Sequence, residues 1–135
     1  MLKDITFLRV EDVAVAIVPD NAQDADEGDW RVYLINLKPD AIDSVLITSK
    51  GYGTVNGKSV STTTLRQYIR RIEGMQVVGI ELLRRNVCPL NNEFWISFWH
   101  QGALYDKKYV FVTNSLVPDN FTLIPLLNQR GVMIR

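Results

Sequence analysis

The stretch "GYGTVNGKS", residues 51–59, carries the glycines, lysine and serine of a phosphate-binding loop. Such a P-loop has one glycine, four other residues and then Gly-Lys-Ser or Gly-Lys-Thr, between a strand and a helix. Gly57, Lys58 and Ser59 match the end of this pattern, but Tyr52 stands where the first glycine is required. The residues that follow are mostly β-branched or small and do not favour an immediate helix, so no helix dipole would face a phosphate. The sequence therefore does not predict a nucleotide site here.

The same stretch has the chemistry of a hairpin. Asn56 and Gly57 both tolerate the positive φ angles of a type I′ turn, and residues that could end a strand flank them on both sides. We therefore predict a hairpin tip at Asn56-Gly57. Gly51 and Gly53, in the strand before the tip, predict a bulge or a close backbone approach.

His100, the only histidine, and Cys88, the only cysteine, are the remaining candidates for catalysis. A histidine that acts as a general base needs a nucleophile or an acidic partner beside it, and nothing in the sequence pairs one with His100. We favour the structural interpretations, a strand-end histidine and a small buried cysteine. A zinc site would need further histidine or cysteine ligands. We assign no catalytic residue, no metal ligand and no cofactor, and an enzyme is the least favoured class.

The acidic loop at residues 20–29 invites comparison with a calcium-binding loop. Asp24 and Asp26 match the first two ligand positions of an EF-hand. The glycine then comes one residue early, at Gly28, and Ile35 takes the place of the bidentate glutamate. We interpret the loop as an exposed acidic segment without a metal.

The 135-residue chain is 47% hydrophobic and 22% charged, which is the composition of one globular domain over residues 1–135. No apolar run approaches the roughly 18–20 residues that span a bilayer, and acidic residues near the start argue against a secretory signal. With a single cysteine and no membrane partner, we expect a cytoplasmic protein. The formal net charge is zero, but residues 1–49 are acidic and residues 50–85 are basic. The simpler interpretation is that the two parts neutralise each other, and the alternative is a basic patch for a phosphate-bearing partner.

Short runs of β-branched and aromatic residues, separated by turn chemistry, predict strands along most of the chain. These strands are expected at residues 13–18, 30–37, 44–50, 76–83, 93–99 and 103–112. One segment differs, because Leu65, Tyr68 and Ile72 have the spacing of a helix face, and Gly74 is placed to cap its C-terminus. We therefore predict a mainly β fold, an antiparallel β-sandwich (immunoglobulin-like or partly open barrel) with one short helix near residues 65–73. The alternative is an α+β sheet that carries the helix on one face.

The stretch "NEFWISFWHQGALYDKKYVFV" predicts a second hairpin, with Gln101-Gly102 as its turn. Alternation outward from this turn places one set of side chains in the core: Phe94, Ile96, Phe98, Tyr105 and Tyr109. The opposite face carries Trp95, Ser97, Trp99, Leu104, Asp106 and Lys108. Two tryptophans on the more polar face are unusual in a monomer. Either another part of the domain covers them, or they form a partner-binding surface or a stacking platform for a ligand.

These patterns predict two alternative functions. The first is a non-enzymatic protein-interaction module, in which Trp95, Trp99 and Lys108 bind a protein partner or a second copy of the chain. The apolar tail at residues 120–135 is a further candidate surface. The second function is an RNA or phosphate-ligand binder that uses the basic segment. Its candidate anion-binding residues are Lys50, Lys58, Arg66, Arg70 and Arg71.

The segments "VYLINLKPDAIDSVLITSKGYG" and "NEFWISFWHQGALYDKKYVFV" resemble a small family of uncharacterised single-domain bacterial proteins, and the resemblance covers most of the chain. Members of this family sometimes carry a label that relates them to phenylalanyl-tRNA synthetase. Aminoacylation is not expected, because the chain is far too short for a catalytic synthetase core and shows none of the class II synthetase motifs. The resemblance implies at most a binding role close to tRNA, and it implies no active-site residues.

Overall fold

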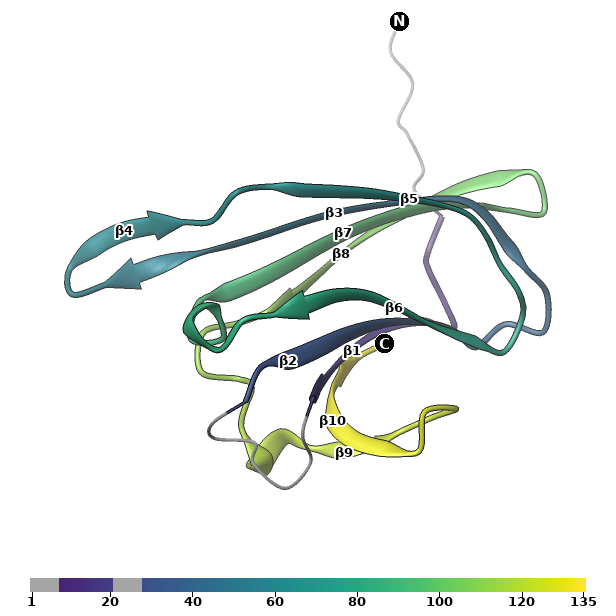
Figure 1. Ribbon diagram of the computed structural model, residues 1–135. Helices are drawn as coiled ribbons and strands as arrows, with labels where there is room; N and C mark the ends of the chain where they lie inside the picture. Colours follow the sequence, from purple (N-terminus) through teal and green to yellow (C-terminus); the bar gives the residue numbers. More distant parts are fainter. Residues whose placement is uncertain (1–7, 21–27) are drawn as a thin grey trace, which may run out of the picture.

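The structure is a computed structural model, and it describes residues 8–20 and 28–135 of the chain. Two antiparallel sheets pack face to face (Figure 1). The strands are β1 (Val13–Pro19), β2 (Trp30–Asn36), β3 (Ile42–Val55), β4 (Lys58–Ser61), β5 (Leu65–Ile72), β6 (Gln76–Leu83), β7 (Asn91–His100), β8 (Ala103–Phe111), β9 (Thr122–Ile124) and β10 (Gln129–Ile134). The helical elements of the described residues are two short 3₁₀ turns, η1 (Arg85–Val87) and η2 (Pro118–Asn120). The predicted β-sandwich is confirmed, and its described strands form no closed barrel.

The lower sheet in Figure 1 has the strand order β6-β2-β1-β10-β9. In the upper sheet β3 pairs with β7, and β7 pairs with β8. β4 and β5 both lie on the other side of β3, where β5 pairs with residues 42–49 and β4 pairs with residues 52–55. The β3–β4 hairpin therefore projects beyond the sandwich, at the left of Figure 1.

The main core lies between the two sheets. β1 sends Val13, Val15 and Ile17 into this core, where they are at most 1% exposed. The residues that alternate with them, Ala14 and Ala16, belong to a second, smaller cluster with side chains from the β9–β10 hairpin. Because β1 is covered on both sides, its sequence is a continuous apolar run rather than an alternating one.

The predicted helix near residues 65–73 is wrong, because Leu65–Ile72 forms β5 and pairs with β3 along its length. A helix of this length is marginal in water, whereas pairing with β3 satisfies the backbone of the whole segment. Ile69 and Ile72 pack against the core, and the predicted helix would also have placed them on its buried face. The alternative α+β architecture is wrong for the same reason, and Gly74 caps no helix.

Both predicted hairpin turns are confirmed. Asn56 and Gly57 have φ angles of 51° and 77°, and Val55 pairs with Lys58. Gln101 and Gly102 have φ angles of 50° and 78°, and the strands continue outward from this turn in regular register. Turn chemistry is set by neighbouring residues alone, which is why the sequence was sufficient to predict it.

Gly51 and Gly53 pair regularly with the neighbouring strands, so the bulge considered for them is not found. Neighbouring side chains approach them closely instead. A Cβ atom on Gly51 would lie 3.2 Å from Thr62 Cγ2, and one on Gly53 would lie 3.3 Å from Leu90 Cδ2.

Within the described ranges there is no helix with the length and hydropathy needed to cross a membrane.

Candidate functional site

The β7–β8 hairpin alternates as predicted, with one face in the core and the other on the surface. Phe94, Ile96 and Phe98 are at most 1% exposed. Trp95 and Trp99 alternate with them and are each 46% exposed. The described residues therefore leave both indole rings open to solvent, on the outer face of the upper sheet.

β3 and β5 extend this exposed surface across the sheet. Leu46 of β3 pairs with Ser97 of β7 and with Tyr68 of β5, and directly paired side chains point to the same side. Leu46 and Tyr68 are 52% and 58% exposed, and Leu104, opposite Trp99, is 53% exposed. We call this set the outer apolar face: Leu46, Tyr68, Trp95, Trp99 and Leu104.

Polar neighbours hold Trp95 in place on this face. Its indole Nε1 donates a hydrogen bond to the Asp106 carboxylate. Lys108 Nζ lies 4.8 Å from the ring centroid and also pairs with Glu93 Oε1 at 3.9 Å. A side chain fixed in this way loses less rotamer freedom when a partner binds. The fold therefore places Lys108 beside Trp95, as the alternation along the hairpin predicted.

A shallow hollow of about 390 Å³ lies beside Trp95 on the same face. Leu8, Leu46 and Leu104 contribute its apolar lining, and Asp106 is one of its polar groups. A hollow bounded by an indole ring and leucine side chains can take up an apolar anchor from a partner.

The five predicted anion-binding residues lie on β3, β4 and β5 of the upper sheet, but the fold does not bring all of them together. Arg66 pairs with Thr48, which in turn pairs with Trp95, so these three side chains share one face. Lys58 pairs with Val55 at the hairpin tip, seven residues farther along β3 than Thr48 and roughly 23 Å away at about 3.3 Å per residue.

Some of these five basic side chains already form ion pairs with acidic residues of the chain. Lys50 Nζ lies 3.9 Å from Glu93 Oε2. Arg71 Nε lies 2.8 Å from Glu73 Oε1, and Arg71 also pairs with Asp43 at 3.6 Å. The remaining three, Lys58, Arg66 and Arg70, form no ion pair with another residue of the described segments, but Lys58 lies at the distant hairpin tip. Arg66 and Arg70 are therefore the better placed of the five to meet an anionic partner.

His100 has an acidic partner that the sequence analysis did not find. Its Nε2 contacts the Asp40 carboxylate, and Gln101 Nε2 donates to the same carboxylate at 3.1 Å. Within the described segments no hydroxyl or thiol is hydrogen-bonded to His100, so the contact lacks the nucleophile of a catalytic dyad. It joins the loop before β3 to the β7–β8 turn.

Cys88 follows η1, near the start of β7, whereas His100 ends that strand. The thiol donates a weak hydrogen bond to the Arg84 carbonyl at 3.5 Å. Burial raises the pKa of Cys88 to about 11. The thiol therefore stays protonated near neutral pH and is a poor nucleophile.

Neither a phosphate-binding helix nor a metal cluster occurs in residues 8–20 and 28–135. Lys58 and Ser59 begin a strand, β4, rather than a helix. No three His, Cys, Asp or Glu side chains of these ranges group so that they could hold a metal ion. Asp24 and Asp26, which match two EF-hand positions, lie outside the described residues.

Sequence reasoning missed Leu46 and Tyr68 as surface residues, for identifiable reasons. Leu46 lies in an unbroken apolar run, 45–47, where alternation does not show which residue faces solvent. Tyr68 was assigned to the buried face of a helix that does not form. No family model matches the chain, and no curated protein matches it in sequence. The resemblance to the family with the synthetase-related label therefore stays a prediction.

Proposed function

We propose that the protein is a non-enzymatic interaction module that forms a homodimer through the outer apolar face. The observation that carries this proposal is the exposure of five large side chains on neighbouring strands of one sheet. Contiguous apolar patches are uncommon on monomers and often mark interaction sites. A cytoplasmic location is part of the proposal and rests on the single cysteine.

A second copy of the chain is the partner that we propose for the outer apolar face. Arg66 lies at the β5 edge of the face and Asp106 at the β8 edge, with the apolar side chains between them. In a dimer with its two-fold axis parallel to the strands, the β5 edge of one copy lies over the β8 edge of the other. Arg66 lies in the row of Trp95 and Lys108, whereas Asp106 lies two residues away along β8, about 6.6 Å from that row. Arg66 of each copy would therefore reach Asp106 of the other copy diagonally, with Lys108 directly opposite.

The tryptophans provide the first test of the homodimer. Light scattering should give twice the 15.4 kDa chain mass at low and at high salt, because salt screens an apolar contact little. The Trp95→Ser/Trp99→Ser variant should be a monomer, since a buried tryptophan near the centre of an interface contributes about 2 kcal/mol or more. Its fold should persist, because both side chains are exposed in the monomer.

The matched control for this test is Val112→Ser/Leu123→Ser. These two side chains are 57% and 60% exposed and lie outside the outer apolar face. The control should remain a dimer. A wild-type chain that stays monomeric at every concentration, or a tryptophan variant that still dimerises, would contradict the proposal.

One observation favours a second candidate function, the binding of single-stranded RNA. Because β5 is a strand, Arg66 and Tyr68 share the outer face of the sheet with Trp95. Proteins that bind single strands combine aromatic side chains, on which bases stack, with basic groups that follow the phosphates. The binding role close to tRNA that the resemblance implies is compatible with this chemistry.

A titration with a 15-nucleotide oligouridine, followed by tryptophan fluorescence, tests this second candidate. Affinity should fall steeply with salt, by a log–log slope of about −0.7 for each phosphate contacted. The Arg66→Ala/Arg70→Ala variant should bind more weakly and with a shallower slope. Lys58→Ala should change little, because Lys58 lies at the distant hairpin tip. Binding that ignores salt, or that survives the loss of both arginines, would exclude this function.

A further inference from the structure

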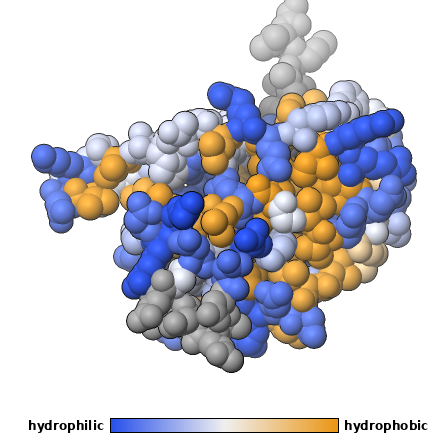
Figure 2. All heavy atoms as spheres, viewed as in Figure 1, coloured by the Kyte–Doolittle hydropathy of each residue, from blue (hydrophilic) through white to orange (hydrophobic). Residues whose placement is uncertain are grey.

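A pocket separate from the outer apolar face opens between the two sheets. It has a volume of about 250 Å³ and lies between β3, at residues 49–51, and the end of β6, at residues 81–83. In Figure 2, hydrophobic side chains gather in the middle of the view, between the upper and the lower sheet. Leu65, Leu83 and Phe94 belong to the apolar lining of the pocket.

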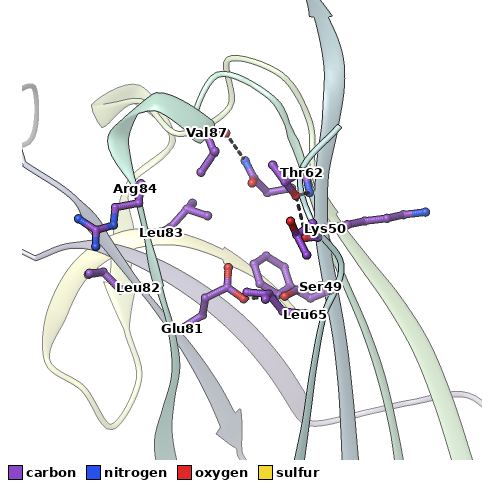
Figure 3. Close-up of a pocket in the computed structure, with 13 residues that line it drawn as sticks. Ser49, Lys50, Thr62, Leu65, Glu81, Leu82, Leu83, Arg84 and Val87 are labelled. Atoms are coloured by element: carbon purple, nitrogen blue, oxygen red, sulfur yellow. Dashed lines mark hydrogen bonds between the residues drawn. The ribbon is translucent and has the colours of Figure 1, made fainter. Parts of the chain in front are cut away.

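Glu81 places a carboxylate in this apolar setting. Figure 3 shows its side chain directed from β6 toward β3, where Glu81 Oε1 accepts a hydrogen bond from Ser49 Oγ at 2.6 Å. Burial raises the pKa of Glu81, and the hydrogen bond from Ser49 offsets this only in part. Within the described segments Glu81 forms no ion pair. A carboxylate withdrawn from water without a cation is costly, so its charge is largely uncompensated.

The basic side chains around the pocket are directed elsewhere. Lys50 points away from it in Figure 3 and pairs with Glu93, on the outer face of the sheet. Arg84 also points away and pairs with Asp29 at 3.7 Å. Arg66 contributes to the hollow that adjoins Glu81, but its side chain shares the outer face of the sheet with Trp95 and forms no ion pair with Glu81. The pocket thus keeps one acidic group and no basic group that neutralises it.

Two hydroxyl groups of the pocket, those of Ser49 and Thr62, are already used by the protein, and the third, that of Thr63, belongs to an exposed residue. Ser49 donates to Glu81, and Thr62 Oγ1 accepts from the Gly51 N–H at 2.8 Å while donating to the Thr63 carbonyl at 3.1 Å. The charged group that the pocket leaves without a partner of opposite charge is therefore the Glu81 carboxylate, which lies beside apolar walls. A ligand that fits must carry a positively charged donor and an apolar part.

We propose that this pocket binds a small organic amine in its ammonium form, with the ammonium group on Glu81 and a short apolar substituent against Leu83 and Phe94. An apolar cavity of about 150 Å³ is large enough for benzene. A volume of about 250 Å³ therefore admits an amine with one aromatic ring. This proposal does not depend on the homodimer, because the pocket and the outer apolar face share none of their residues.

The direct test is an NMR titration of the 15N-labelled chain with benzylammonium, with benzyl alcohol and benzoate as neutral and anionic probes of the same ring. Benzylammonium should shift the amide signals of Ser49, Leu83 and Val87, and it should bind at least about tenfold more tightly than benzyl alcohol. Equal binding of the neutral probe, or shifts that map to another part of the fold, would overturn the proposal.

Two substitutions of the same type locate the charge that matters. Glu81→Gln keeps the size and the acceptor of the side chain and removes its charge, so benzylammonium should bind at least about tenfold more weakly. Glu11→Gln alters an exposed glutamate outside the pocket and should leave binding unchanged. The Trp95→Ser/Trp99→Ser variant should also bind as the wild type does, which separates this site from the dimer interface. Unchanged binding in Glu81→Gln would overturn the proposal.

Thermal unfolding provides an independent measurement on the unliganded chain. A carboxyl whose pKa is raised in the folded state favours folding at acid pH, and this contribution is lost as pH rises through the folded pKa. Glu81→Gln should therefore melt at a higher temperature than the wild type at pH 7, and the difference should vanish near pH 4. The other charged side chains that line this pocket or the adjoining hollow are those of Lys50, Arg66 and Arg84. A lower melting temperature for Glu81→Gln at pH 7 would show that the charge is already compensated, against the proposal.

Discussion

Replacing Gly74 with alanine should cost about 3 kcal/mol of unfolding free energy, at the upper end of the usual cost of overpacking. A Cβ atom at this position would lie 2.3 Å from the Pro39 carbonyl oxygen and 2.8 Å from the Asp40 nitrogen. Both are backbone atoms, so no side-chain rotation can relieve the clash. The connection between β5 and β6 would have to move away from the loop between β2 and β3. Urea unfolding followed by circular dichroism measures the loss.

Gly79→Ala is the matched control for this prediction. Gly79 lies in β6, and an added Cβ atom there would be 3.7 Å from the Tyr33 ring, an ordinary contact distance. Its unfolding free energy should therefore change by less than about 1 kcal/mol. If Gly74→Ala is as stable as Gly79→Ala, then the two connections do not pack as closely as the structure places them.

Asn36→Asp should be at least as destabilising, by about 3–5 kcal/mol, which is the range for a buried charge without a partner. The side chain is fully buried, and Nδ2 donates to the carbonyls of Asp40 at 3.0 Å, Glu73 at 3.0 Å and Ile72 at 3.3 Å. Oδ1 accepts from the Lys38 N–H at 3.0 Å. An ionised carboxylate cannot donate, so it would face three carbonyl oxygens with no proton between them.

The pH dependence of Asn36→Asp distinguishes this cause from general disruption. The variant should recover part of its stability in acid, because a protonated carboxyl donates one hydrogen bond and carries no charge. Denaturant unfolding at pH 7 and pH 4 measures this recovery. Asn114→Asp, at an exposed turn, should show almost no loss at either pH. A loss in Asn36→Asp that is the same at both pH values would show that charge is not its cause.

Asn36 and Gly74 matter for the same structural reason. The chain passes from the lower to the upper sheet between β2 and β3, and it returns between β5 and β6. The two connections touch at these residues, and the Met75 N–H also bonds to the Lys38 carbonyl at 3.0 Å. The sheets that carry the outer apolar face and the Glu81 pocket are thus joined at this point.

The sequence predicted two separate surfaces, one with the tryptophans and one with the arginines. Because residues 65–72 form strand β5, the structure joins these two surfaces. As a helix, residues 65–73 would have presented Arg66, Arg70 and Arg71 on a surface of their own. As a strand next to β3, the segment sets Arg66 in the same row as Trp95 and sets Tyr68 beside Leu46. One face of the sheet therefore underlies both functions that we propose.

The sequence by itself determined most of the strands, the two hairpin turns and the buried side of the β7–β8 hairpin. These features depend on residues close together in the chain, because turn residues set φ locally and alternation sets the face of a strand. Tertiary structure alone decided that Leu65–Ile72 is a strand, that Asn36 bonds to Glu73, and that Glu81 lies against Ser49. Each of these depends on a partner more than ten residues away, and the free energy of nonlocal pairing and burial outweighs the local helical spacing.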